Sequence, residues 1–122
     1  MVILLAEDDE VLQWAIWILL KADGFTVLTA DDGKAALEAS RNYSGIIDLL
    51  LSDVDMPRMG GLDLSQTIAA ERPGIKVLMM SGGVRGIEQV RMRGLPFLQK
   101  PFTATALRDS IEALLGSIPP LR

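Results

Sequence analysis

The stretch Ile46-Ile47-Asp48-Leu49-Leu50-Leu51-Ser52-Asp53 decides the fold that we predict for this chain. Its apolar residues are continuous over 49–51 rather than alternating, which is typical of a parallel strand covered on both faces. A loop rich in helix and strand breakers follows at once, Val54-Asp55-Met56-Pro57-Arg58-Met59-Gly60-Gly61. A carboxylate at the end of a buried strand is costly unless its charge is used. We therefore expect Asp53 to belong to a functional site.

Two other charged clusters also follow apolar runs. Glu7-Asp8-Asp9 ends a first run over 2–6, and Lys100-Pro101 ends a last run over 96–99. The carboxyl ends of parallel strands meet at one edge of a sheet, which is where open α/β folds bind their ligands. The three clusters are therefore predicted to form one site.

Apolar runs and helical patterns alternate strictly along the chain. Such alternation predicts an α/β domain with a parallel sheet and helices on both faces. Asp9 and Thr103 are expected to cap helices, and Asp48 is expected to be a solvated charge at the start of its strand. The predicted strands cover 2–6, 25–29, 47–52, 75–80 and 96–99. The predicted helices cover 10–22, 33–41, 62–72, 86–93 and 104–115.

Composition narrows the possible functions. The 122 residues suit one domain with a substantial core, and the net charge of −4 argues against nucleic-acid binding by this domain. There is no cysteine and no histidine, which excludes disulfides, thiolate catalysis and imidazole bases. No apolar run is long enough to span a membrane. We therefore expect a cytoplasmic protein that does not act at a membrane.

The ordered motifs identify a family. Glu7-Asp8, Asp53 with Met56-Pro57 and Gly61, Ser81-Gly82 and Lys100-Pro101-Phe102 occur in this order, each motif after an apolar run. In this pattern the chain resembles a response-regulator receiver domain, the chemotaxis-regulator-like phosphoacceptor module of two-component signalling. The resemblance covers 1–116 and leaves 117–122 as a C-terminal tail. It implies a single flavodoxin-like, doubly wound (βα)5 domain whose five-stranded parallel sheet has the order 2-1-3-4-5.

The resemblance also implies a metal cofactor, Mg²⁺ or Mn²⁺. Clustered carboxylates repel one another and need a cation to stay ionised together, and a hard divalent ion takes oxygen ligands. By resemblance, Asp8 and Asp53 bind the metal directly and Glu7 acts through a water molecule. The backbone carbonyl of Asp55 supplies a further ligand.

Asp53 is, by resemblance, the phosphoacceptor nucleophile, which forms an acyl phosphate. Lys100 and Ser81 each hold a phosphoryl oxygen. Ser81 and Phe97 form the conformational switch that follows phosphorylation, or else Phe97 is constitutively buried. Pro101 is a candidate for a cis peptide bond after Lys100. The stretch from Ser81 to Lys100 is shorter than usual in the family, so the helix within it must be short.

The donor must be a partner protein, because the chain has no histidine of its own. The resemblance implies a sensor histidine kinase or a phosphotransfer protein. Trp14 and Trp17 lie on the outer face of the helix predicted over 10–22, which suggests an interaction site. We expect them to contact a partner helix or a second copy in a homodimer. The alternative is that they contact only their own chain.

The predicted function is two-component signal transduction. The domain takes a phosphoryl group onto Asp53, changes conformation and signals through protein contacts; it is not an enzyme beyond its own phosphorylation and dephosphorylation. One alternative is a pseudo-receiver that binds proteins without being phosphorylated. Another is a haloacid-dehalogenase-like phosphatase, because Asp53-Val54-Asp55 resembles that family's DxD motif. That family places the motif at its first strand and needs a longer chain.

Overall fold

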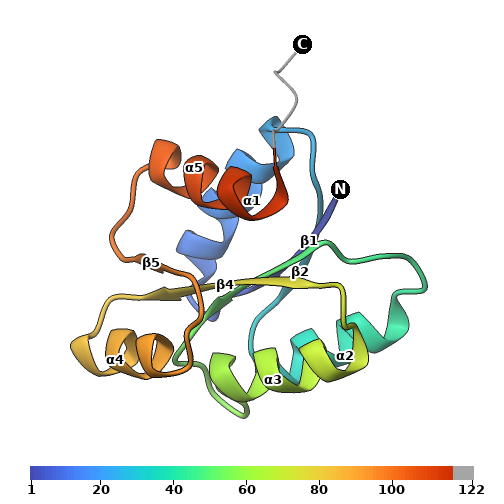
Figure 1. Cartoon of the computed structure of the whole chain (residues 1–122). Coiled ribbons are helices and arrows are strands. Elements are labelled where there is room, and N and C mark those ends of the chain that lie inside the picture. Colours follow the sequence, from blue (N-terminus) through green and yellow to red (C-terminus); the bar gives the residue numbers. More distant parts are fainter. Residues whose placement is uncertain (117–122) are drawn as a thin grey trace.

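The five strands pair in parallel in the order β2-β1-β3-β4-β5, which confirms the predicted topology. The computed structural model describes residues 1–116 and is drawn in Figure 1. The predicted tail, 117–122, lies outside the described residues. The strands are β1 (Val2–Ala6), β2 (Thr26–Ala30), β3 (Leu49–Asp53), β4 (Lys76–Ser81) and β5 (Phe97–Gln99). The helices are α1 (Glu10–Ala22), α2 (Gly33–Asn42), α3 (Gly61–Glu71), α4 (Val84–Met92) and α5 (Ala104–Leu115).

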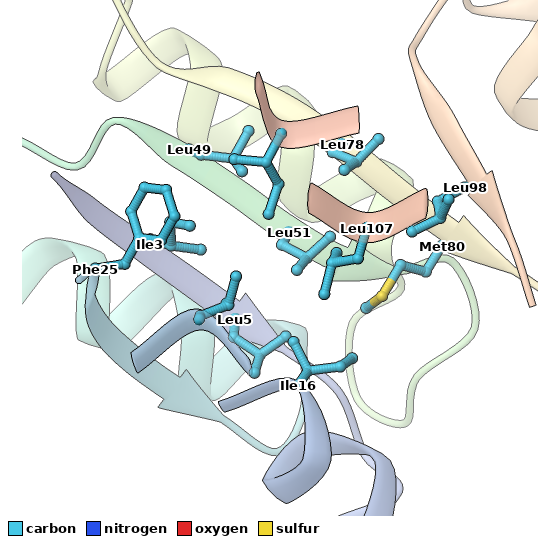
Figure 2. Close-up of a cluster of buried hydrophobic side chains, with 12 residues drawn as sticks. Ile3, Leu5, Ile16, Phe25, Leu49, Leu51, Leu78, Met80, Leu98 and Leu107 are labelled. Atoms are coloured by element: carbon cyan, nitrogen blue, oxygen red, sulfur yellow. The ribbon is translucent and has the colours of Figure 1, made fainter. Parts of the chain in front are cut away.

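Helices α1 and α5 cover one face of the sheet (Figure 1). Alternate residues of the strands point to this face, because successive side chains of a strand lie on opposite sides. Figure 2 shows the resulting cluster, in which Leu5 of β1 lies near Ile16 of α1, Ile3 lies beside Phe25, and Leu107 comes from α5. Leu12 and Leu19 of α1 pack at its margin, as the helical spacing predicts.

Helices α2, α3 and α4 cover the opposite face (Figure 1). Leu4 of β1 and Leu50 of β3 pack there with Ile68 of α3. A smaller cluster joins Met79 of β4 to Val90 of α4. Both faces of the central strands are thus buried, which accounts for the continuous apolar sequence of β3.

Helix starts follow the predicted capping residues. The Asp9 carboxylate accepts hydrogen bonds from the amides of Val11 and Leu12, and Thr103 caps α5 in the same way through the amide of Ala106. None of the helices in the described part of the chain is both long and apolar enough to cross a membrane.

The start of β3 differs from the prediction. Ile46 is 78% exposed and lies before the strand, which begins at Leu49 and includes Asp53 as its last residue. Asp48 is not a merely solvated charge, because its Oδ2 accepts a hydrogen bond of 2.8 Å from the backbone amide of Val2. Arg72 of the α3 C-cap holds the preceding loop by donating to the carbonyls of Ser40, Tyr43 and Gly45.

Helix α4 is short, as the sequence predicts, but it begins at Val84 rather than at Gly86. Gly83 is its N-cap and makes no side-chain capping bond. A glycine in the first turn is no bar to helix formation, since its cost is only about 1 kcal/mol relative to alanine. The earlier start places Gly86 inside the helix, directly beside the end of β4.

Candidate functional site

Acidic side chains from two strands meet at the carboxyl edge of the sheet. Glu7 and Asp8 directly follow β1, and Asp53 is the last residue of β3; these two strands are neighbours. One carboxylate oxygen from each of the three residues lies within 4.8 Å of the others. The structure therefore brings together the carboxylates that the sequence analysis assigned to one site.

Lys100 enters the same cluster from the end of β5. Its Nζ lies 2.6 Å from Glu7 Oε1 and 3.3 Å from Asp53 Oδ2. Its backbone amide donates to the carbonyl of Ser81 at 2.8 Å, which anchors the residue to the end of β4. The peptide bond from Lys100 to Pro101 is cis. The ammonium group thus bridges the carboxylates of β1 and β3.

The electrostatic balance of the site is negative. Burial raises the pKa of Glu7, which is only 1% exposed, although hydrogen bonds from Lys100 and from the Asp9 amide oppose the shift. Burial also raises the pKa of Asp53; the charge of Lys100 opposes this, and the charge of Asp8 adds to it. One ammonium does not offset three carboxylates, so the site favours an additional cation.

The loop between β3 and α3 forms one wall of the site. Asp8 and Asp55 line an open pocket of about 360 Å³, together with Val54, Met56, Pro57 and Gly60. Gly61 begins α3, and a Cβ on it would lie only 2.0 Å from the backbone oxygen of Asp53. Only glycine lets the loop return so closely to the strand end, which gives a physical reason for glycine at this position.

Ser81 lies at the end of β4 and is buried. Its hydroxyl makes two long hydrogen bonds of 3.3 Å: it accepts from the amide of Gly83 and donates to the carbonyl of Gly83. A Cβ on Gly86 would lie 2.4 Å from the Ser81 Oγ, so this glycine provides the space for the hydroxyl. Sequence analysis missed the role of Gly86, although a glycine within a helical pattern is a recognisable signal.

Phe97 is the first residue of β5, and Lys100 follows the opposite end of that strand. It is half-buried beside the small core cluster of β4 and α4, and the Arg91 guanidinium carbon lies 5.5 Å from its ring centroid. This is within the range of a cation–π contact. The ring is therefore neither fully buried nor free of contacts.

Trp14 and Trp17 lie on α1, outside the acidic cluster. Their exposed fractions are 65% and 37%, and the neighbouring Val11 and Ile18 are exposed as well. These four residues, which we call the α1 apolar patch, lie on the helix that begins next to Asp8.

A further polar residue, Gln13, holds the segment that carries Glu7 and Asp8, and sequence analysis missed it. Its Nε2 donates to the carbonyls of Glu7 and Ala30 at 2.9 and 3.2 Å and to Asp31 Oδ1 at 3.0 Å. It thereby joins the ends of β1 and β2 beside the site. A single glutamine on a helix has no sequence pattern that would have indicated this role.

Comparison with known proteins agrees with this geometry. The family model for the response regulator receiver domain matches residues 3–112. The chain is 33% identical over 119 residues to the sensor kinase CckA of Brucella abortus and 32% identical over 118 residues to the cell cycle response regulator CtrA of Brucella ovis. Each match covers 93% of this chain but only 12% of the kinase and 49% of the regulator. The chain thus spans half or less of these relatives.

A solved structure extends the comparison to the fold. The receiver domain of the sensor histidine kinase PA1611 from Pseudomonas aeruginosa PAO1, with a magnesium ion coordinated in its active-site cleft, superposes with a TM-score of 0.83 at 26% identity. The match covers 95% of this chain and 98% of that one. The strand order, the motifs and the family match lead to one conclusion: this chain belongs to the response regulator receiver domains of two-component signalling.

Proposed function

We propose that this domain accepts a phosphoryl group onto Asp53 from a phosphohistidine of a sensor kinase or phosphotransfer protein. The observation that carries the proposal is the convergence of Glu7, Asp8 and Asp53 at one sheet edge, with the Lys100 ammonium in contact with two of these carboxylates. A carboxylate oxygen of Asp53 forms the new P–O bond. The donor's P–N bond breaks, and the imidazole leaves with the bonding electrons. Positioning and charge neutralisation supply most of the catalysis in such transfers.

The donor set suits a divalent cation. The three carboxylates offer hard oxygen ligands, and Asp55 lines the pocket beside Asp8. Asp8 and Asp53 would hold Mg²⁺ directly, with the Asp55 carbonyl, and Glu7 would act through water; Mn²⁺ has similar ligand preferences. A bound ion supplies positive charge to the phosphoryl oxygens. A related receiver domain whose structure holds magnesium in its active-site cleft supports this assignment.

Lys100 and Ser81 complete the proposed site. The ammonium lies 3.3 Å from the Asp53 carboxylate, so it is close enough to bind an oxygen of a phosphoryl group attached there. The two hydrogen bonds of the Ser81 hydroxyl are long, so it can exchange them for a phosphoryl oxygen at little cost. We propose that Ser81 on β4 and Phe97 on the neighbouring strand β5 form the switch, with Ser81 moving toward the phosphoryl group.

The proposal is tested by intact mass after incubation with Mg²⁺ and a small acyl phosphate. The wild-type domain is expected to gain the mass of one phosphoryl group, and a chelator should prevent the gain. No gain, in a protein for which calorimetry shows Mg²⁺ binding, would instead favour a pseudo-receiver that works only as a protein-binding module. Steady turnover of a small phosphate ester would favour a phosphatase. We expect neither of these two outcomes. We also expect the domain to have no enzymatic activity beyond its own phosphorylation and dephosphorylation.

The α1 apolar patch is proposed as the docking surface for the phosphodonor or for a second copy. The Trp14→Ala and Trp17→Ala variants are expected to slow transfer from a phosphorylated histidine phosphotransfer domain by about tenfold, since aromatic residues dominate interfaces. Phosphorylation by the small acyl phosphate should be unchanged, because the patch lies outside the acidic cluster. Sedimentation velocity would reveal any loss of self-association.

A matched control for the patch is Val84→Ala, which removes an apolar side chain that is 75% exposed on α4. It is expected to affect neither transfer nor self-association. If the tryptophan variants behave like this control in both assays, the two side chains contact only their own chain and the docking proposal is wrong.

A further inference from the structure

The loop between β3 and α3, residues 54–60, is tied to the start of α2 by an ion pair. Arg58 Nε lies 2.7 Å from Asp32 Oδ2, and its second contact, from Nη2 to Oδ1, is 3.1 Å. Two parallel N–H···O bonds fix the relative orientation of guanidinium and carboxylate as well as their distance. Asp32 is itself held in place, because it is buried and its Oδ1 caps α2 by accepting from the amide of Ala35 at 2.8 Å.

Backbone contacts reinforce this ion pair. The amide of Gly33 donates to the carbonyl of Met59 at 3.2 Å, and a Cβ on Gly33 would lie 2.2 Å from that oxygen. Arg58 has a φ of 66°, in the left-handed region that residues with a side chain seldom adopt. The loop therefore lies directly on the first turn of α2, in a conformation that its own sequence does not favour.

The loop also carries part of the proposed metal site. Asp55 lies three residues before Arg58, and the loop residues from Val54 to Pro57, with Gly60, line the same open pocket as Asp8. Any displacement of the loop would move the Asp55 carbonyl relative to the carboxylates of Asp8 and Asp53. Groups that orient the ligands of a metal commonly affect its affinity without touching it.

We propose that Arg58 and Asp32 are positioning residues for the divalent cation: their ion pair, here called the loop clamp, sets the place of the Asp55 carbonyl. The inference rests on the proposed function, since it concerns the cation that the phosphoacceptor site would bind. The inference adds to the proposed metal site two residues, Arg58 and Asp32, that do not coordinate the cation themselves. It also predicts that α2, on the far side of the loop, is energetically coupled to metal binding.

Two conservative variants test the clamp. Arg58→Asn removes the guanidinium but tolerates the left-handed backbone, and Asp32→Asn keeps an oxygen for the helix cap while removing the charge. Each is expected to raise the Kd for Mg²⁺, measured by isothermal titration calorimetry, by about tenfold. The double variant should be no weaker than either single variant, because both remove the same interaction.

The chain offers a matched control in a second bidentate pair. Arg41 and Glu71 join α2 to α3 through contacts of 3.1 and 2.7 Å, but neither lies on the loop. Arg41→Gln is therefore expected to leave the Kd for Mg²⁺ unchanged. Amide hydrogen exchange gives a readout without metal: Gly33 and Gly61, whose amides bond to Met59 and Val54 of the loop, should exchange faster in Arg58→Asn but not in Arg41→Gln.

The outcomes separate the two proposals. If the wild-type domain binds no Mg²⁺, the proposed metal site is wrong and the inference fails with it. If the wild-type domain binds Mg²⁺ and both clamp variants bind it equally well, only the loop clamp is overturned. A lower melting temperature with unchanged Mg²⁺ affinity would also overturn it, because the ion pair would then serve the fold alone.

Discussion

The Asp53→Asn variant is expected to gain no phosphoryl group under conditions in which the wild-type domain gains one. Asparagine keeps the shape of the side chain at the end of β3 but lacks the carboxylate that would attack phosphorus. Asp53 is the best-placed acceptor candidate, since it is 9% exposed and its carboxylate lies 3.3 Å from the Lys100 Nζ. Intact mass measured in parallel for both proteins, with Mg²⁺ and a small acyl phosphate, checks the expectation.

The control for this substitution is Asp55→Asn. Asp55 lies two residues further along the loop and is proposed to contribute only its backbone carbonyl, so its variant should still gain the phosphoryl group. If Asp53→Asn still gains the phosphoryl mass, or if only Asp55→Asn fails to gain it, Asp53 is not the acceptor and the proposed mechanism is wrong.

The same Asp53→Asn substitution is expected to stabilise the fold near neutral pH. Burial raises the pKa of Asp53, so the folded protein binds a proton more readily than the unfolded chain. Stability from such a group is fully present below its unfolded pKa and is lost as pH rises through its folded pKa. An uncharged asparagine at this position does not ionise, so this loss of stability is absent, and Lys100 keeps its contact of 2.6 Å with Glu7. Urea unfolding with a chelator and no divalent cation should therefore show a gain in the free energy of unfolding on the order of 1 kcal/mol at neutral pH that disappears in acid.

Much of the fold could be predicted because the signals for it are local. The apolar run over 2–6 became β1 without change, and Asp9 and Thr103 cap α1 and α5 as their side-chain chemistry predicts. Parallel pairing then places every strand's carboxyl end at one edge. This rule predicted that Asp8, Asp53 and Lys100 share one site. The distances between their side chains could not be predicted from it.

The residues that sequence reasoning missed act across long separations in the chain. Asp48 accepts from the amide of Val2, and Arg58 pairs with Asp32; neither contact has a spacing that a periodic pattern could reveal. Polar side chains that bond to distant backbone or side-chain groups are placed by the tertiary structure. This is why the acidic cluster was predictable and the groups that support it, Gln13 among them, were not.

The Lys100→Met variant is expected to destabilise the domain by about 3 kcal/mol at slightly alkaline pH. Methionine matches much of the length of the lysine side chain but removes the ammonium that lies 2.6 Å from Glu7 and 3.3 Å from Asp53. Removing one partner of a buried ion pair costs about 3–5 kcal/mol, because the other charge stays buried without compensation. The side chain of Lys100 is 21% exposed, so we expect the lower end of this range. Urea unfolding of both proteins measures the difference.

The pH dependence of that loss distinguishes charge from packing. Burial already raises the pKa of Glu7 above its ordinary value of 4.5 while Lys100 opposes the shift, so removing the ammonium raises the pKa further. Protonation of Glu7 then removes the uncompensated charge. The difference in the free energy of unfolding between variant and wild type should therefore shrink as pH falls from about 8 to about 5. Lys76→Met removes an exposed lysine at the start of β4, and its free energy of unfolding should match that of the wild type at both pH values. An equal loss at both pH values for Lys100→Met would mean that the aliphatic part of the side chain, rather than its charge, stabilises the site.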